Sequence, residues 1–225
     1  MTATHHTIAV LGGTGSEGSG LALRWARAGH RVVIGSRSSE KAAKICAELN
    51  ALAGVESIEF MDNRSAVRAA QIVVLTVPFG AQRATVDEIR DALVGKILID
   101  ATVPLVPPKV SRVQLPPGGS AVAVIQELLG DSVRVVSAFQ NVSAQHLKDL
   151  THDIDCDVLV CGNDAAARET VIGLARDLRL RGYHAGTIGN SAAAEALTSV
   201  LIAINVRYKV PGAGIRITGV PEVAS

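Results

Sequence analysis

The chain has 225 residues, of which 48% are hydrophobic, 19% charged and only 3% aromatic. This balance suits a packed core of aliphatic side chains and excludes an intrinsically disordered chain. The formal net charge is +1, no run of like charges occurs, and the apolar stretches are too short to span a bilayer. We therefore expect neither a nucleic acid nor a membrane as a partner.

The N-terminus and the cysteines indicate the compartment. The first six residues lack the basic and apolar regions of a signal peptide, and an odd number of cysteines argues for reduced thiols. Cys46, Cys156 and Cys161 have no metal-ligand spacing around them, so they are predicted to be core residues. The sequence predicts a cytoplasmic protein without a metal site.

The stretch from Ile8 to Arg37 reads as a strand, a glycine turn, a helix and a second strand. Gly13, Gly15 and Gly18 form the pattern G-x-G-x-x-G where the first strand meets the helix. Gly13 is expected to allow the tight turn, Gly15 to let the backbone approach a pyrophosphate, and Gly18 to let the helix pack closely. Together with the free N–H groups of the helix start, this predicts a dinucleotide site. The alternative is a glycine-rich turn without a ligand.

The end of the second strand indicates which dinucleotide binds. NAD sites usually carry an acid there for the ribose 2′-OH, whereas NADP sites place an arginine for the 2′-phosphate. This chain has Ser36 and Arg37, with Lys41 four residues further on, and no acid at that point. A hydroxyl, a guanidinium and an ammonium suit a phosphate, so we predict NADP. Arg37 and Lys41 could instead be ordinary surface charges.

The chain then alternates between helix and strand patterns. Ala42, Ile45, Leu49 and Leu52 share one helix face, and Asn63 is expected to cap the next helix. Up to residue 150, helices are expected from residue 38 or 39 to about 53 and over 63–70, 81–93, 120–129 and 143–147; strands are expected over 57–60, 71–78, 96–100 and 133–138.

Two segments that follow strands are candidates for the site. Val77 and Pro78 end one strand, where a nicotinamide cofactor would pass, although they could simply terminate it. Residues 101–119 hold five of the eight prolines and form a loop too long for a simple turn. Such loops are usually functional, so we expect Thr102, Val103 and Pro104 to open one wall of the active site.

The last part of the chain repeats the alternation. Strands are expected over 157–161 and 183–188, with a helix over 165–178 between them. A final helix, starting at Asn190 or Ser191, is apolar nearly all round through Ile204, so it should be buried on more than one side. A homodimer interface would explain this.

The chain offers no convincing catalytic side chain. No nucleophile elbow, zinc-protease motif or CxxC pair occurs, and the histidines are scattered. The expected strand tips carry Thr76, Thr102, Gln140 and Asn141, none of which is a good acid. Hydride transfer between two stacked rings needs proximity more than acid–base residues, so no catalytic residue is assigned.

Several blocks of the sequence resemble the NADPH-dependent reductases of the deazaflavin coenzyme F420, also called F420H2:NADP oxidoreductases. The resemblance covers nearly the whole chain. It rests on V-L-G-G-T-G and the following helix (residues 10–30), G-S-R-x-x-E-K-A (35–42), V-L-T-V-P (74–78), V-V-S-A (135–138), D-V-L-V-C-G-N-D (157–164) and N-S (190–191).

This resemblance implies an α/β fold in which a Rossmann-type, doubly wound parallel sheet over residues 1–150 binds NADP. A small C-terminal α/β domain over residues 151–225 would close the cleft and dimerise. Coenzyme F420 would lie in that cleft and exchange a hydride with NADP(H).

The resemblance also implies residue roles. Thr14, Gly15, Ser16, Glu17, Ser36, Arg37 and Lys41 would hold NADP, and Val77, Ala81, Val103 and Ala144 would lie near the nicotinamide. The chain departs from the family at Gln140, where histidine is frequent, and at Phe79, where tryptophan is frequent. Two alternatives stay open: an NADP-dependent reductase of a small carbonyl, imine or flavin, and a non-catalytic NADP-binding regulatory module.

Overall fold

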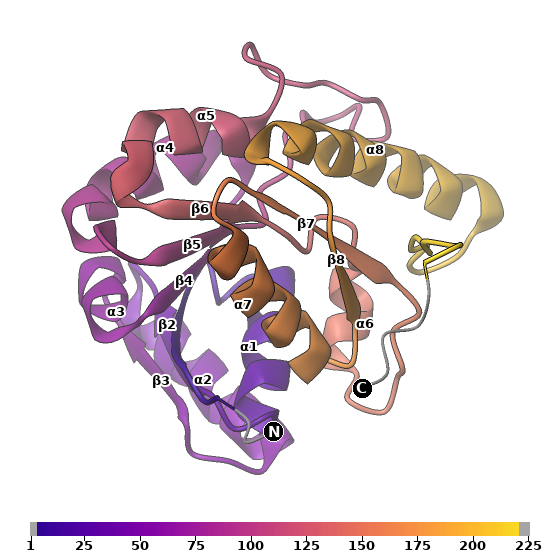
Figure 1. Ribbon diagram of the computed structural model, residues 1–225. Helices are drawn as coiled ribbons and strands as arrows, with labels where there is room; N and C mark the ends of the chain where they lie inside the picture. Colours follow the sequence, from indigo (N-terminus) through magenta and orange to yellow (C-terminus); the bar gives the residue numbers. More distant parts are fainter. Residues whose placement is uncertain (1–3, 221–225) are drawn as a thin grey trace.

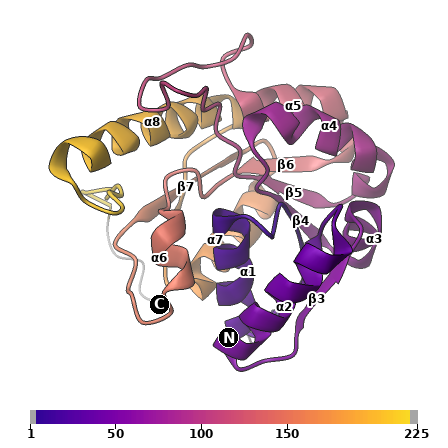
Figure 2. The same cartoon turned by 180° about the vertical axis from the view of Figure 1, so that it is seen from behind.

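The computed structural model describes residues 4–220 and shows one eight-stranded sheet between layers of helices (Figures 1 and 2). The strand order is β3-β2-β1-β4-β5-β6-β7-β8. The first six strands are parallel, β7 runs antiparallel to β6, and β8 runs parallel to β7. The strands are β1 (Thr7–Leu11), β2 (Arg31–Gly35), β3 (Ile58–Met61), β4 (Ile72–Leu75), β5 (Ile97–Asp100), β6 (Arg134–Ser137), β7 (Asp157–Gly162) and β8 (Arg181–His184).

Helices connect the strands. The α-helices are α1 (Ser16–Arg27), α2 (Ser39–Ala53), α3 (Asn63–Ala69), α4 (Phe79–Ile89), α5 (Ala121–Leu129), α6 (Ala144–Lys148), α7 (Ala165–Asp177) and α8 (Ser191–Tyr208). Short 3-10 helices follow at η1 (Arg90–Leu93), η2 (Gly130–Ser132) and η3 (Ile188–Asn190). The helix expected over 81–93 is thus divided into α4 and η1, and the strand expected over 183–188 lies earlier in the chain.

The sheet is buried on both faces, as parallel strands usually are. In β1, Ile8 and Val10 join one core with side chains of α1, α2 and α7, while Ala9 and Leu11 join a second core with α3, α4 and α5. Because successive side chains of a strand point to opposite faces, the continuous apolar runs of the sequence supply both cores. This confirms the predicted α/β fold with a doubly wound sheet.

The C-terminal part of the chain continues the same sheet. Val136 of β6 pairs with Gly162 of β7, and the Trp25 Nε1–H of α1 donates to the carbonyl of Leu174 in α7 at 3.1 Å. The division into domains at residue 150 stays a prediction. α8 packs its first turns on α5, and no helix within residues 4–220 is long and apolar enough to cross a membrane.

Two local expectations change. Leu52 is 53% exposed, because α2 packs through Ala42, Cys46 and Leu49, and Leu52 lies off that line. The N-cap of α3 is Asp62, whose Oδ1 accepts from Ser65 N at 2.9 Å, and not Asn63. In the single chain Val206 and Tyr208 of α8 are over 70% exposed, so burial of α8 on more than one side stays a prediction that depends on a second subunit. The three cysteines are free thiols buried in the core, as predicted.

Candidate functional site

The predicted site residues come together at one edge of the sheet. Leu11, Gly35, Leu75, Asp100 and Ser137 lie in register at the carboxyl ends of β1, β2, β4, β5 and β6. The segments that follow these strands therefore share one edge, where open α/β sheets bind ligands. They carry every predicted cofactor residue: Gly13, Thr14, Gly15, Ser16, Glu17, Gly18, Ser36, Arg37, Lys41, Val77, Pro78, Ala81, Val103 and Ala144.

The turn after β1 is packed against the tip of β4. Gly12 has a φ of 84°, and a Cβ there would lie 2.8 Å from the Thr76 carbonyl oxygen. A Cβ on Gly18 would lie 2.4 Å from Thr76 Oγ1. The left-handed residue of the turn is therefore Gly12, one position before the motif, and a Cβ on Gly13 would lie 3.0 Å from the Val10 carbonyl oxygen, so both glycines serve the tight turn. The close packing expected of Gly18 is present.

The start of α1 fits a phosphate group. Gly15 is the N-cap residue and makes no side-chain cap, and both Gly15 and Ser16 are exposed. The first N–H groups of the helix are therefore available to an anion, and the helix dipole favours a negative charge there. A Cβ on Gly15 would meet only the Gly12 carbonyl oxygen, at 3.2 Å, so the backbone is open to a ligand.

The tip of β2 presents the three residues predicted to select NADP. Arg37 and Lys41 are exposed, and their side chains make no ion pair with any residue between 4 and 220. The Ser36 hydroxyl donates to the Ser38 carbonyl oxygen and accepts from the Ser38 N–H, both at 3.1 Å. Ser36 thus fixes the turn that leads into α2, and the two cations are left free for an anion.

The tips of β4 and β5 supply small apolar groups. Pro78 is the N-cap of α4 and accepts from Ala81 N at 2.8 Å. Val77, Val103 and Ala144 are half-buried, and Ala144 is the first residue of α6. These surfaces suit a flat ring, and none of them can exchange a proton.

Arg24, in the last turn of α1, binds the end of α6 and the loop that follows it. Its Nε donates to the Leu147 carbonyl at 2.8 Å, and one terminal nitrogen donates to the carbonyls of His146, Asp149 and His152 at 3.0, 2.6 and 3.1 Å. Because α6 begins at Ala144, these bonds fix that residue relative to the glycine turn.

A buried polar network lies behind the tips of β5 and β6. Asp100, with no exposed surface, accepts from Gln82 Nε2 at 2.6 Å and from Thr102 N at 2.9 Å. Gln140 Nε2 donates to the Asp100 carbonyl at 2.8 Å, and its Oε1 has no partner within the described residues. Burial raises the pKa of the Asp100 carboxyl. Gln140 also lines a cavity of about 120 Å³ between the β6–α6 loop and α8.

Glu195 of α8 joins this region to α5. It is 1% exposed and accepts from the Ser120 hydroxyl at 2.6 Å and from the N–H groups of Ala121 and Val122 at 2.7 and 3.2 Å. A carboxylate at a helix N-terminus is favourable, and here it comes from another helix. Burial raises the pKa of Glu195, while these donors lower it.

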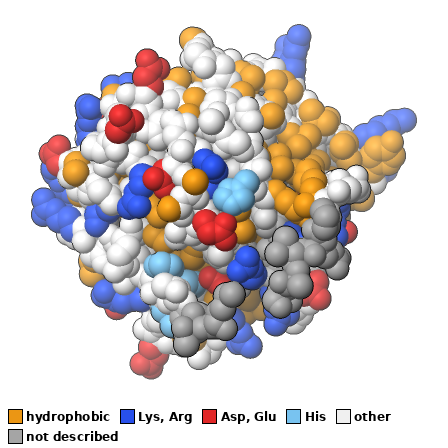
Figure 3. Space-filling view, in the orientation of Figure 1, with side chains coloured by type: hydrophobic (Ala, Val, Ile, Leu, Met, Phe, Trp, Pro, Cys, Tyr) orange, Lys and Arg blue, Asp and Glu red, His pale blue; other side chains and the backbone are white. Residues whose placement is uncertain are grey.

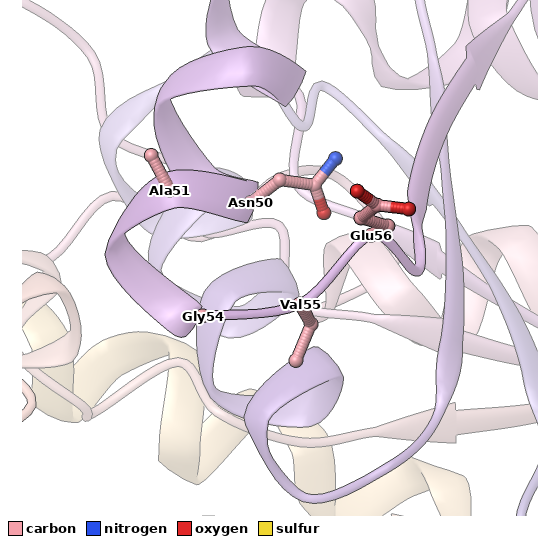
Figure 4. Close-up of a pocket in the computed structure, with 5 residues that line it drawn as sticks. All are labelled: Asn50, Ala51, Gly54, Val55 and Glu56. Carbon is pink, nitrogen blue, oxygen red and sulfur yellow. The ribbon is translucent and has the colours of Figure 1, made fainter.

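A second hollow lies at the opposite edge of the sheet. It is lined by Asn50, Ala51, Gly54, Val55 and Glu56, between the end of α2 and the start of β3 (Figure 4). The Asn50 amide is already bonded to both backbone groups of Ile58. No group of three or more His, Cys, Asp and Glu side chains among residues 4–220 is placed to hold a metal ion. The carboxyl edge therefore remains the candidate site.

Three residues of this edge were missed by the sequence patterns. Gly12 stands one residue before the glycine motif, and its conformation depends on the approach of Thr76. The sequence did indicate that Asp100 and Glu195 are unusual acids, because Asp100 ends a buried strand and Glu195 is the lone acid in an apolar helix. Their partners lie 18 and 75 residues away, so the pairing could not be inferred.

Comparisons with known proteins identify the family. Residues 7–104 match the model of the family described as NADP oxidoreductase, coenzyme F420-dependent. The F420-dependent NADP reductase of Methanocaldococcus jannaschii is 42% identical over 219 residues, which cover 94% of this chain and 97% of the relative. That of Methanothermobacter thermautotrophicus is 41% identical over 222 residues, which cover 96% of both chains.

A solved structure agrees with these relatives. A crystal structure of a proposed F420-dependent NADP reductase from an Arthrobacter species superposes with a TM-score of 0.80 at 26% identity, and the match covers 95% of this chain and 99% of that one. The chain therefore belongs to the coenzyme F420-dependent NADP oxidoreductases, which confirms the family, the enzyme class and the redox pair of NADP and F420 that the sequence predicts.

Proposed function

We propose that the hydride passes between NADP(H) and coenzyme F420 at the carboxyl edge of the sheet, over the tips of β4 and β5. The supporting observation is that the register of five parallel strands brings the glycine turn, the free cations and the apolar tips to this one edge. Within the described residues, the tips of β4 and β5 present Val77, Pro78 and Val103, none of which can exchange a proton with the rings. Positioning of the two rings therefore supplies the catalysis.

In this proposal the phosphates lie on the β1 and β2 side. Backbone N–H groups at Ser16 and Glu17, beside the open backbone of Gly15, bind the pyrophosphate, and Arg37 with Lys41 binds the 2′-phosphate. The open backbone at Gly15 and the absence of ion pairs for the two cations within the described residues support this assignment. A guanidinium can bind the 2′-phosphate of NADPH through two hydrogen bonds, and NADH lacks this phosphate.

The nicotinamide end would lie against Val77, Pro78, Ala81, Val103 and Ala144. These groups exclude water and give a flat, apolar surface. Arg24 of α1 bonds to the end of α6, and α6 begins at Ala144, so Ala144 is fixed relative to α1. The bound nucleotide itself supplies the hydride chemistry.

The deazaflavin would enter beside Gln140, from the side of α8. The cavity between the β6–α6 loop and α8 and the unpartnered Gln140 Oε1 support this placement, because a buried acceptor needs a donor. The pyrimidine ring of a deazaflavin carries an N–H group that could donate to it.

A spectral titration tests the function. NADPH should bleach oxidised F420 when catalytic amounts of the protein are added, and NADH should do so far more slowly. A flavin, a small ketone and a cyclic imine should give no comparable turnover. NADPH binding without bleaching of F420 would reject the deazaflavin as the physiological partner. Binding without turnover of any acceptor would favour a regulatory module.

We also propose that the chain forms a homodimer through α8. Hydrophobic side chains gather at the side of the molecule where α8 ends (Figure 3), and Val200, Ile204, Val206, Tyr208 and Val210 of this region are exposed. Contiguous exposed apolar surface usually marks an interface. Sedimentation should show a dimer that Val206→Asp dissociates, whereas Val94→Asp, at an exposed valine elsewhere, should leave it intact. A monomeric parent protein would reject the proposal.

The separate C-terminal domain and the cytoplasmic location are also proposals. The three reduced, buried thiols support a reducing compartment. Fluorescence microscopy of the tagged protein in its host would test the location.

A further inference from the structure

Arg24 is a buried arginine that joins α1 to α6. It is 7% exposed, and its guanidinium donates to four main-chain carbonyl oxygens at the end of α6 and in the loop after it, at distances between 2.6 and 3.1 Å. Burying a cation is costly unless its donors are satisfied, and the last carbonyls of a helix lack partners within that helix. The two needs are met together, so the end of α6 is fixed on α1.

α6 is a short helix that connects Arg24 to the proposed ring sites. His146 and Leu147, whose carbonyls accept from Arg24, donate their own N–H groups to the Ser143 carbonyl at 3.1 and 3.3 Å. Ser143 is the N-cap of α6 and lines the cavity proposed for the deazaflavin, and the next residue is Ala144, proposed to lie near the nicotinamide. One helical turn therefore separates the guanidinium from two residues that would face the rings.

α1 carries the proposed pyrophosphate site at its other end. The helix begins at Ser16, and Arg24 follows eight residues later, a rise of about 12 Å along the axis. The packing of α1 on α6 is tight, because a Cβ on Gly20 would lie 2.5 Å from the Leu147 Cβ. A single rigid helix therefore holds the phosphate end of the site and, through Arg24, one wall of its nicotinamide end.

We propose that Arg24 is a positioning residue for hydride transfer, which sets where the nicotinamide lies relative to the bound pyrophosphate and to the deazaflavin. It acts through α6 and touches neither ring. A displacement of about 1 Å can cost about a hundredfold in rate, so a loosened α6 should slow the transfer although no reacting group is removed. The inference rests on the proposed position of the nicotinamide against Ala144.

Two variants displace α6 by different means. Arg24→Met removes all four bonds and keeps an apolar stem. Gly20→Ala keeps the guanidinium and inserts a Cβ 2.5 Å from the Leu147 Cβ, while alanine suits a helix interior. Arg24→Lys retains the charge and can donate to some of the carbonyls, so its effect should be smaller than that of Arg24→Met.

Arg27→Met is the matched control. Arg27 lies in the same last turn of α1, and its Nη1 donates to the Ala53 carbonyl at the end of α2 at 3.0 Å. This arginine therefore makes the same kind of bond to a different helix end. Its replacement should leave the parent behaviour unchanged in both measurements below.

Binding measurements without F420 separate positioning from a general loss of structure. NADP⁺ and 2′-phospho-ADP-ribose, the same nucleotide without its nicotinamide, are titrated separately by calorimetry. Damage to the phosphate site weakens both ligands and cancels in the ratio Kd(2′-phospho-ADP-ribose)/Kd(NADP⁺). This ratio should exceed one in the parent protein. It should fall about fivefold in Arg24→Met and Gly20→Ala, which corresponds to about 1 kcal/mol.

Single-turnover mixing of NADPH with oxidised F420 gives the second measurement. At saturating concentrations, the rate of bleaching should fall about ten- to a hundredfold in Arg24→Met and Gly20→Ala, and less in Arg24→Lys. Circular dichroism identifies the variants that are folded, and Gly20→Ala with Arg24→Lys decides the matter if Arg24→Met is not. An unchanged ratio and rate in the folded variants, or equal losses in Arg27→Met, would overturn the inference.

The outcome is separable from the proposed function. If NADPH bleaches F420 equally fast in the parent protein and in Gly20→Ala and Arg24→Lys, the inference fails and the function stands. If the parent protein binds neither nucleotide, the proposed function fails as well.

Discussion

Two parts of the same sheet edge are built in opposite ways. On the β1–β2 side, the groups proposed to face the ligand are backbone N–H groups and exposed side chains from two short stretches, residues 12–18 and 36–41. On the β5–β6 side, Asp100, Gln140 and Glu195 are buried and bonded to partners between 18 and 75 residues away. The first side is left open for a ligand, and the second is satisfied mostly by the protein itself.

Because of this difference, we expect the first side to contribute mainly to ligand binding and the second mainly to folding stability. A group that faces a ligand has few internal partners, so its removal weakens binding and changes folding little. A buried group with several donors leaves them unpaired when it is removed, so folding suffers first. The predictions below test that separation, beginning with the largest expected effect.

Glu195→Ala should lower the free energy of unfolding by about 4 kcal/mol, because it leaves Ser120 and two N–H groups of α5 without their buried acceptor. Urea unfolding at pH 7 measures this. Glu169→Ala is the control, since Glu169 pairs with His184 at the surface and is exposed. Its effect should stay within about 0.5 kcal/mol. Equal effects of both variants would contradict the comparison.

Gly18→Ala should destabilise the protein by about 2–3 kcal/mol, because the new Cβ lies 2.4 Å from Thr76 Oγ1 and 2.8 Å from the Gly12 carbonyl oxygen. It should also weaken the binding of NADP⁺ and NADPH. Gly173→Ala, in the middle of α7, meets no atom within 4 Å. That control should gain about 0.5–1 kcal/mol from helix propensity. Thermal unfolding of the two variants gives the comparison, and a stable Gly18→Ala would argue against close packing at the turn.

Arg37→Ala should weaken NADPH binding by about 1–3 kcal/mol, as expected for a lost charge-assisted bond. The affinity for NADH and the free energy of unfolding should stay nearly unchanged. Fluorescence titration of both nucleotides measures the effect. Arg83→Ala serves as the control, because Arg83 is an exposed arginine of α4 paired with Asp87. Equal losses for NADPH and NADH would show that Arg37 does not contact the 2′-phosphate.

Glu17→Gln should change the pH dependence of stability. The pKa of Glu17 is raised from 4.5 to about 8 on folding. As pH rises through this window, the unfolded chain ionises first, so the parent protein loses stability that Glu17→Gln keeps. We expect a difference of about 1.5 kcal/mol at pH 9, less than the whole shift implies, because the N-terminus of α1 stabilises a carboxylate. Chemical unfolding of both proteins at pH 5 and pH 9 checks this. If the difference in unfolding free energy between the two proteins is the same at pH 5 and at pH 9, the raised pKa of Glu17 is contradicted.

Much of the fold could be read from the sequence, and the reason is local. Apolar runs such as residues 8–11 and 72–75 are continuous because their strands are buried on both faces. The glycine motif and Arg37 lie close together in sequence, so the nucleotide side of the site could be predicted from short motifs. The errors were local as well: Leu52 and Asn63 fit a helix pattern whose packing face and cap are decided by neighbours.

The β5–β6 side could not be read in the same way. Nothing near Asp100 in the sequence indicates that Gln82 and Gln140 would bond to it, and nothing near Glu195 indicates the start of α5. The left-handed turn at Gly12 likewise depends on the approach of Thr76 from a distant strand. Each of these contacts exists only after the sheet has formed.

The sequence by itself determined the order of strands and helices, the family, and the cations suited to a 2′-phosphate, because these depend on periodicity and on short motifs. Tertiary structure alone decided that β7 joins the sheet in the antiparallel direction, that Glu195 caps a helix 74 residues away, and that Glu17 lies within reach of the Asp100 charge. Burial and long-range pairing set the charge state of an acid, and a sequence pattern records neither.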